Sequence, residues 1–128
     1  MATITAQILL DQNNWATTDI HATSATALTR VEYLIDDAID YINSQAGTSI
    51  SNMSGAAGSK TLTVTAAQAP IIKQLAALLV RAYLDKGPNV SVGGLGVSAI
   101  VGDPQYKVAM MMVKTGIRRL RGASFVRT

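Results

Sequence analysis

Apolar residues recur every three or four positions in three separate stretches of the chain, and each stretch predicts an amphipathic helix. The first covers residues 29–46, where Thr29 and Glu32 match the S/T-x-x-E capping box. Gly47 follows as a residue suited to a left-handed helix end. The apolar positions form one face: Val31, Leu34, Ile35, Ala38, Ile39, Ile42 and Ala46.

The second predicted helix, residues 67–86, is apolar around most of its circumference. This pattern is typical of a helix that is buried on several sides. Pro70 falls in its first turn, where a missing N–H does little harm, and Gly87-Pro88 is expected to end it.

The third predicted helix, residues 104–120, begins with Asp103-Pro104, an N-cap residue followed by proline at the first helical position. Helical spacing gives this helix three distinct sides. One apolar stripe contains Tyr106, Met110, Val113, Ile117 and Leu120. A second apolar stripe contains Val108, Met111, Met112 and Thr115. A basic side contains Lys107, Lys114, Arg118 and Arg121.

The remaining segments show weaker patterns. Residues 48–64 are expected to be irregular or extended, and the alternation in KTLTVT predicts a short strand. Residues 89–102 mix β-branched residues with glycines, which favours a flexible loop or an irregular hairpin. Residues 1–28 are polar and weakly periodic and are expected to form an N-terminal arm, while residues 122–128 are expected to form an extended C-terminal tail.

The prediction is therefore a single domain over residues 1–128 of the mainly α class. A small bundle of three main helices fills residues 29–121, with an extended loop or short hairpin between the last two. At 128 residues, with 48% apolar residues, the chain can bury a core of ordinary size.

Charge divides the chain into an acid-rich beginning and a base-rich end. Residues 1–46 hold six acids and one base, and residues 105–128 hold six bases and no acid. Charged residues make up only 15% of the chain, below the roughly 25% of soluble domains, which indicates that part of the surface faces other protein. Such ends can attract each other between neighbouring subunits, or the basic end can meet an outside polyanion.

The reactive groups that an enzyme needs are sparse, so we expect no enzyme, cofactor or metal site. His21 is the one histidine, and the absence of cysteine excludes thiolate metal sites and disulfides. Residues 94–99 match the G-x-G-x-x-A fingerprint formally, but no second strand with an acid follows. No apolar run approaches the ~20 residues of a membrane span, and no basic region begins a secretory signal. We expect a soluble, cytosolic setting without a membrane.

Four acids of the first predicted helix lie close together. Glu32, Asp36 and Asp40 are spaced four apart and share one helical stripe, with Asp37 adjacent. A solvated acidic face is the first interpretation, and an acidic strip that meets a basic partner is the second. Catalysis or magnesium binding is a distant third, because no other ligand cluster is visible.

The C-terminal cations are the second candidate site: Lys107, Lys114, Arg118, Arg119, Arg121 and Arg127. Cations favour helix C-termini by about 0.3–1 kcal/mol each, but five cations from residue 114 onward exceed what one helix end requires. Contact with nucleic acid or with an acidic protein surface is therefore expected. Only Phe125 interleaves an aromatic ring, which argues against sequence-specific recognition.

The order of these elements resembles a known family. An acid-rich helix with a Tyr-Ile-x-x-x-x-Gly ending, VEYLIDDAIDYINSQAG, precedes a variable loop and the apolar helix AAQAPIIKQLAALLVRAYLDKG. A further loop and the basic helix DPQYKVAMMMVKTGIRRLRG complete the order. Over about residues 28–121 this is similar to the head–tail connector (adaptor, or head-completion) proteins of tailed bacteriophages.

The resemblance implies a structural virion protein. Such a protein forms a ring, usually of twelve copies, between the capsid portal and the tail, and double-stranded DNA passes through its centre. The implied partners are copies of itself, the portal protein and a tail-side or stopper protein, in the virion neck after assembly in the host cytoplasm. The alternative is a small non-specific nucleic-acid-binding protein that uses the basic C-terminal helix and binds duplex DNA with steep salt dependence.

Overall fold

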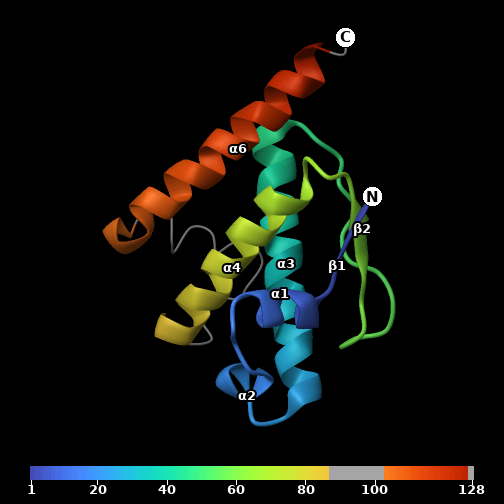
Figure 1. Ribbon diagram of the computed structural model, residues 1–128, viewed down its shortest axis with the longest axis vertical. Helices are drawn as coiled ribbons and strands as arrows, with labels where there is room; N and C mark the ends of the chain where they lie inside the picture. Colours follow the sequence, from blue (N-terminus) through green and yellow to red (C-terminus); the bar gives the residue numbers. More distant parts are fainter. Residues whose placement is uncertain (87–102, 127–128) are drawn as a thin grey trace.

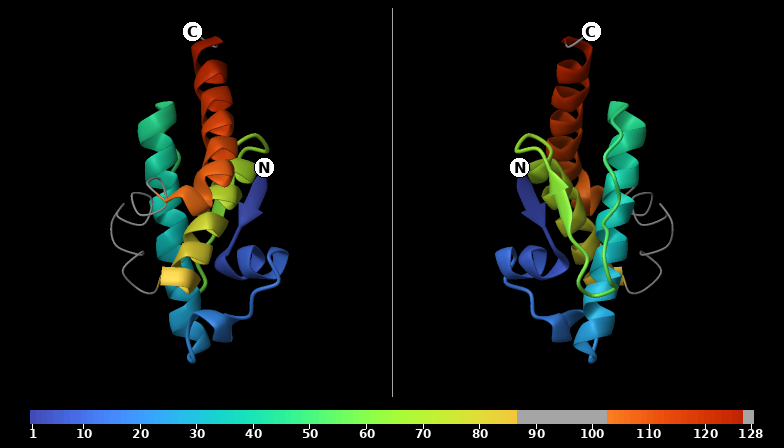
Figure 2. Two further views of the ribbon diagram at one scale, coloured as in Figure 1. Left: turned by 90° about the vertical axis from the view of Figure 1, so that its left-hand side faces the viewer. Right: turned by 90° about the vertical axis from the view of Figure 1, so that its right-hand side faces the viewer.

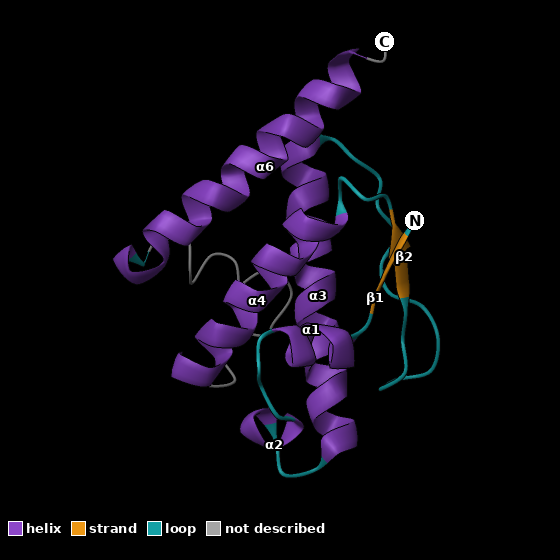
Figure 3. Ribbon diagram, viewed as in Figure 1, coloured by secondary structure: helices purple, strands orange, loops and turns teal. Residues whose placement is uncertain are grey.

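Three long helices form the body of this mainly α protein, for which a computed structural model describes residues 1–86 and 103–126 (Figure 1 and Figure 3). They are α3 (Ser24–Ala46), α4 (Ala69–Lys86) and α6 (Lys107–Val126). Each packs against the other two, and all three contribute to one apolar core. The predicted small helical bundle is confirmed. The loop expected at residues 89–102 lies outside the described residues.

The central helix α3 begins earlier than its sequence pattern predicts. Its N-cap is Thr23, and the predicted capping box at Thr29 is wrong. Thr29 lies inside the helix, where its hydroxyl donates to the carbonyl of Ala25 one turn back at 2.9 Å. The predicted C-terminus is confirmed, because Gly47 adopts a left-handed conformation (φ 70°) and its N–H donates to Asn43 at 3.0 Å.

The N-terminal segment is part of the core, so the expected arm over residues 1–28 is wrong. It forms strand β1 (Ala2–Ile4) and the short helices α1 (Ala6–Gln12) and α2 (Thr17–Ile20). β1 pairs antiparallel with β2 (Leu62–Val64), which confirms the predicted short strand. Leu9 and Leu10 of α1 are fully buried, and Figure 2 shows the segment lying along the bundle.

The last helix follows a 3₁₀ turn, η2 (Pro104–Tyr106). As predicted, Asp103 caps this turn, and its carboxylate accepts the N–H of Gln105 at 3.0 Å. α6 then continues to Val126. The extended tail expected over residues 122–128 is therefore wrong for residues 122–126, which are helical. Gly122 is the weakest helix former in this last part of α6, and its cost of about 1 kcal/mol relative to alanine does not stop the helix.

Candidate interaction surfaces

α6 has three sides, as its spacing predicts. The side that faces α3 and α4 is buried and contributes Met110, Val113, Ile117 and Leu120 to the core. Tyr106, just before the helix, is also buried. The predicted core stripe is therefore confirmed.

The opposite side of α6 carries large apolar side chains in solvent. Val108 is 74% exposed, Met111 is 59% exposed and Met112 is 60% exposed. They stand at positions i, i+3 and i+4 and so form one patch, which we call the outer stripe. Thr115 continues it one turn further and is also exposed. In the described part of the chain nothing covers this stripe.

A row of cations lies on the flank of α6 nearest to α3. The basic row consists of Lys107, Lys114, Arg118 and Arg121, all exposed. Its last three members line a shallow hollow together with Tyr41 and Gln45 of α3. Arg121 has a structural contact there, because its guanidinium Nε donates to the backbone carbonyl of Gln45 at 3.0 Å. That carbonyl belongs to the last turn of α3, whose C=O groups lack partners within the helix.

The two other predicted cations do not belong to the basic row. Arg119 lies on another flank of α6, where it borders a groove with Pro70 and Ile71 at the start of α4. Arg127 lies outside the described residues. The structure therefore brings together four of the six predicted cations.

The acidic residues of α3 do not form one exposed face. Glu32 is only 2% exposed and Asp37 only 8% exposed, whereas Asp36 is half-buried and Asp40 is exposed. Both the solvated face and the continuous acidic strip predicted from the sequence require exposure, so the expectation of one exposed surface made of all four residues is wrong.

Three of these acids bind the loop that runs beside α3. The two carboxylate oxygens of Glu32 accept the N–H groups of Gly58 and Lys60, each at 2.9 Å. Asp36 accepts the N–H of Met53 at 2.9 Å, and Asp40 accepts the side-chain amide of Asn52 at 3.2 Å. The four-residue spacing thus places one carboxylate per helical turn along the loop. Their role in this structure is to hold that loop.

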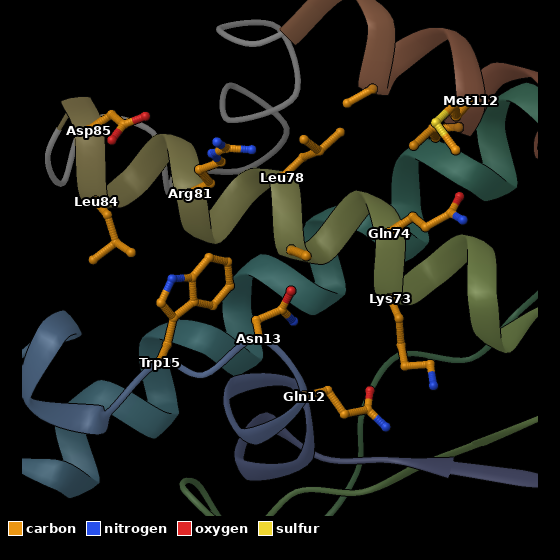
Figure 4. A pocket seen from close by; sticks show the side chains of 13 residues that line it. Gln12, Asn13, Trp15, Lys73, Gln74, Leu78, Arg81, Leu84, Asp85 and Met112 are labelled. Atoms are coloured by element: carbon orange, nitrogen blue, oxygen red, sulfur yellow. The ribbon is translucent and has the colours of Figure 1, made fainter.

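A surface that sequence reasoning missed lies along the exposed face of α4 (Figure 4). It is a trough of about 660 Å³, with α4 as its floor, the α1–α2 connection as one wall and α6 as the other. We call it the α4 trough. Its lining includes Trp15, Lys73, Leu78, Arg81, Leu84 and Met112.

The α4 trough combines apolar and cationic side chains. Trp15, Lys73 and Ala77 are half-buried, and Leu84 and Met112 are partly exposed. Asp85 at one end accepts the phenol O–H of Tyr106 at 2.9 Å and is within 3.4 Å of the amide of Gln105. Burial, together with the Asp85 carboxylate, raises the pKa of the Tyr106 phenol, which favours this donor form.

His21 has a local structural contact. Its ring nitrogen Nδ1 accepts the N–H of Thr23, the N-cap of α3, at 3.0 Å. Among residues 1–86 and 103–126, His, Cys, Asp and Glu side chains do not gather in threes as a metal ion would require. No helix in the same ranges combines the length and the apolar character needed to cross a membrane.

The fold defines the class of this chain as a small mainly α protein. Comparison with protein-family models, with curated proteins and with solved structures finds no match to the chain. Any assignment of function therefore rests on the surfaces described above and on the resemblance in element order.

Proposed function

We propose that this chain is a structural, non-enzymatic subunit that assembles into a ring between the portal and the tail of a tailed-phage virion. The observation that supports this proposal is the outer stripe of α6. Three large apolar side chains are 59–74% exposed on the side of the helix that faces away from the core. Apolar anchors at i, i+3 and i+4 are the pattern that a helix presents to a protein partner.

The energetics favour a covered outer stripe. Full burial of a Val or Met side chain contributes about 1.5–3 kcal/mol, so covering the exposed parts of three such side chains supplies several kcal/mol to an association. In a ring every subunit makes two heterologous contacts, and each copy offers its stripe once. A ring therefore uses this surface in every copy.

The basic row supports a place beside DNA or beside an acidic protein surface. Lys107, Lys114 and Arg118 are exposed, and α6 holds no acid that would neutralise them. Cations on a helix contact phosphates without reading base sequence, which suits a channel through which any DNA sequence must pass. In this proposal the row faces the channel or the portal.

The second candidate function is non-specific binding of nucleic acid by a free monomer. The same basic row favours it, because phosphate contacts supply essentially all of non-specific binding. It does not account for Val108, Met111 and Met112 of the outer stripe, whose apolar side chains offer no group to a phosphate. The two functions differ in whether the isolated chain binds duplex DNA and whether it associates.

A pair of substitutions tests the basic row without disturbing the fold. K114E/R118E reverses two exposed cations and leaves Arg121 in place, because Arg121 bonds to Gln45. We expect native mass spectrometry to show a closed oligomer for the unchanged protein, alone or with its portal protein. The variant should keep its helical circular dichroism and fail to assemble with the portal protein.

The same samples separate the two functions. A chain that stays monomeric alone and with portal protein contradicts the ring. The second function holds if that monomer also binds a duplex DNA of random sequence and its affinity falls steeply between 50 and 200 mM salt. A protein with 6–10 phosphate contacts loses about 10³–10⁵-fold in affinity over this range.

A further inference from the structure

The α4 trough shares only one residue, Met112, with the surfaces used in the proposed ring. Its walls and floor come from the α1–α2 connection, α4 and the α4-facing flank of α6, whereas the basic row borders α3. Val108 and Met111 of the outer stripe do not line it; Met112 alone belongs to both surfaces. An occupant of the trough can therefore be inferred without reference to the ring.

The charge of the trough selects an acidic occupant. Lys73 and Arg81 stand eight residues apart on the floor, and among the described residues no ion pair neutralises either of them. The Asp85 carboxylate also lies at this surface and keeps its negative charge while it accepts the Tyr106 hydroxyl, so two cations stand against one anion. Lys73 and Arg81 are about 12 Å apart along α4, at 1.5 Å per residue, and the net charge of the trough is positive.

The apolar part of the trough selects a ligand with large apolar side chains. Figure 4 shows Trp15 and Leu84 near one end of the trough and Met112 near the other end, beside Gln74. Aromatic and Met side chains of this kind are enriched in the buried centres of interfaces. A ligand that is only acidic would leave them uncovered.

The backbone of the occupant is expected to be helical. The walls and floor are mostly helix, and the N–H and C=O groups of helices are already bonded internally. An extended peptide would bury backbone groups without partners, at about 1–3 kcal/mol for each unsatisfied group. A helical peptide satisfies its own backbone groups and presents only side chains.

We propose that the α4 trough binds an acidic amphipathic helix of a partner protein. Its apolar side chains pack against Trp15 and Leu84 at one end of the trough and against Met112 at the other, and its carboxylates lie beside Lys73 and Arg81. A second copy of this chain fits poorly, because its exposed apolar helix face is the outer stripe of α6. That helix carries no acid, so its cations would meet those of the trough.

Two designed peptides test this proposal on the full-length protein. Both are 16-residue helices without tryptophan, with Leu at i, i+3, i+4 and i+7; one has Glu on the flanking positions and the other has Lys. Trp15 is the one tryptophan of the chain and lines the trough, so its fluorescence reports occupancy. We expect the Glu peptide to shift the Trp15 emission to the blue and to bind at least tenfold tighter than the Lys peptide.

Charge reversal in the trough should invert this preference. K73E/R81E should bind the Lys peptide tighter, whereas K114E/R118E changes the net charge by the same amount outside the trough and should keep the preference for the Glu peptide. Equal affinity for both peptides, an unchanged Trp15 emission, or an equal loss in both variants overturns the proposal. So does a dimer in sedimentation velocity that K73E/R81E disrupts, and that result would also contradict the ring surfaces proposed above. The peptide-binding results do not bear on the ring, because the ring is tested by assembly in native mass spectrometry.

Discussion

At the scale of single residues, Glu32 shows how a buried charge organises a loop. Its carboxylate is almost fully removed from water, yet each oxygen accepts one backbone N–H, from Gly58 and from Lys60. Buried charges are tolerated when hydrogen bonds replace the lost hydration. Gly58 has a φ of 86°, a left-handed conformation that glycine adopts readily, and in this conformation its N–H donates to the carboxylate.

We predict that Glu32→Gln lowers the free energy of unfolding by about 1.5–3 kcal/mol, because the amide keeps one acceptor and places an NH₂ group against a backbone N–H. Urea denaturation followed by circular dichroism measures this change. Asp40→Asn is the matched control: Asp40 is exposed and accepts one long hydrogen bond, so its variant should stay within about 0.5 kcal/mol. Equal losses in the two variants would show that the loop does not depend on Glu32.

At the scale of helix packing, Gly116 sets how closely α6 approaches α4. A Cβ atom placed on Gly116 would lie 2.8 Å from Cγ1 of Ile71 and 3.2 Å from its Cδ1. Ile71 is buried, so its side chain has little room to move away. Gly122 lies in the same helix, and a Cβ atom there would meet nothing within 4 Å. The two glycines therefore differ in packing but share their backbone conformation.

We predict opposite signs for alanine at these two glycines. Gly122→Ala should raise the free energy of unfolding by up to about 1 kcal/mol, the helix propensity difference. Gly116→Ala gains the same helix propensity, but its methyl group overpacks the contact with Ile71. Overpacking costs about 1–3 kcal/mol, so this variant should destabilise the protein. Thermal and urea unfolding of both variants checks this. In an Ile71→Ala background the cost of Gly116→Ala should disappear; a cost that persists there would place its origin elsewhere.

The helical elements could be predicted from sequence because their signal is local. Apolar spacing over 15 to 20 residues identified α3, α4 and α6, and Gly47 and Asp103 marked real helix ends. The N-terminal segment could not be placed, because β1 finds its partner in β2, some 60 residues away. Thr29 and Glu32 matched a capping motif by spacing alone, while their true partners are Ala25 and a loop beyond the helix.

At the scale of the whole molecule, the candidate surfaces were predictable only where one helix forms them. The basic row and the outer stripe of α6 follow from 3.6-residue periodicity. Arg119 shows the limit, because its neighbours on α4 decide which groove it borders. The α4 trough was missed because three segments distant in sequence build it, and Lys73 and Arg81 stand in a mostly apolar helix without forming any motif.

The outer stripe makes assembly and folding separable. Val108 and Met111 are mostly exposed and belong neither to the core nor to the α4 trough. The double variant Val108→Ser, Met111→Ser should therefore change the free energy of unfolding by no more than about 0.5 kcal/mol per site. The apolar area that these side chains bring to a subunit contact is lost, and native mass spectrometry should then show monomers at concentrations where the unchanged protein forms a closed oligomer.

K73E/R81E is the control for this loss, because it alters the exposed surface of the trough and leaves the stripe intact, so its assembly should equal that of the unchanged protein. If the Val108→Ser, Met111→Ser variant instead forms the same oligomer in the same amount, the subunits meet through another surface. The exposed methionines of α6 would then have to be covered by a partner other than a copy of this chain, because a stripe of this kind favours burial in any assembled state.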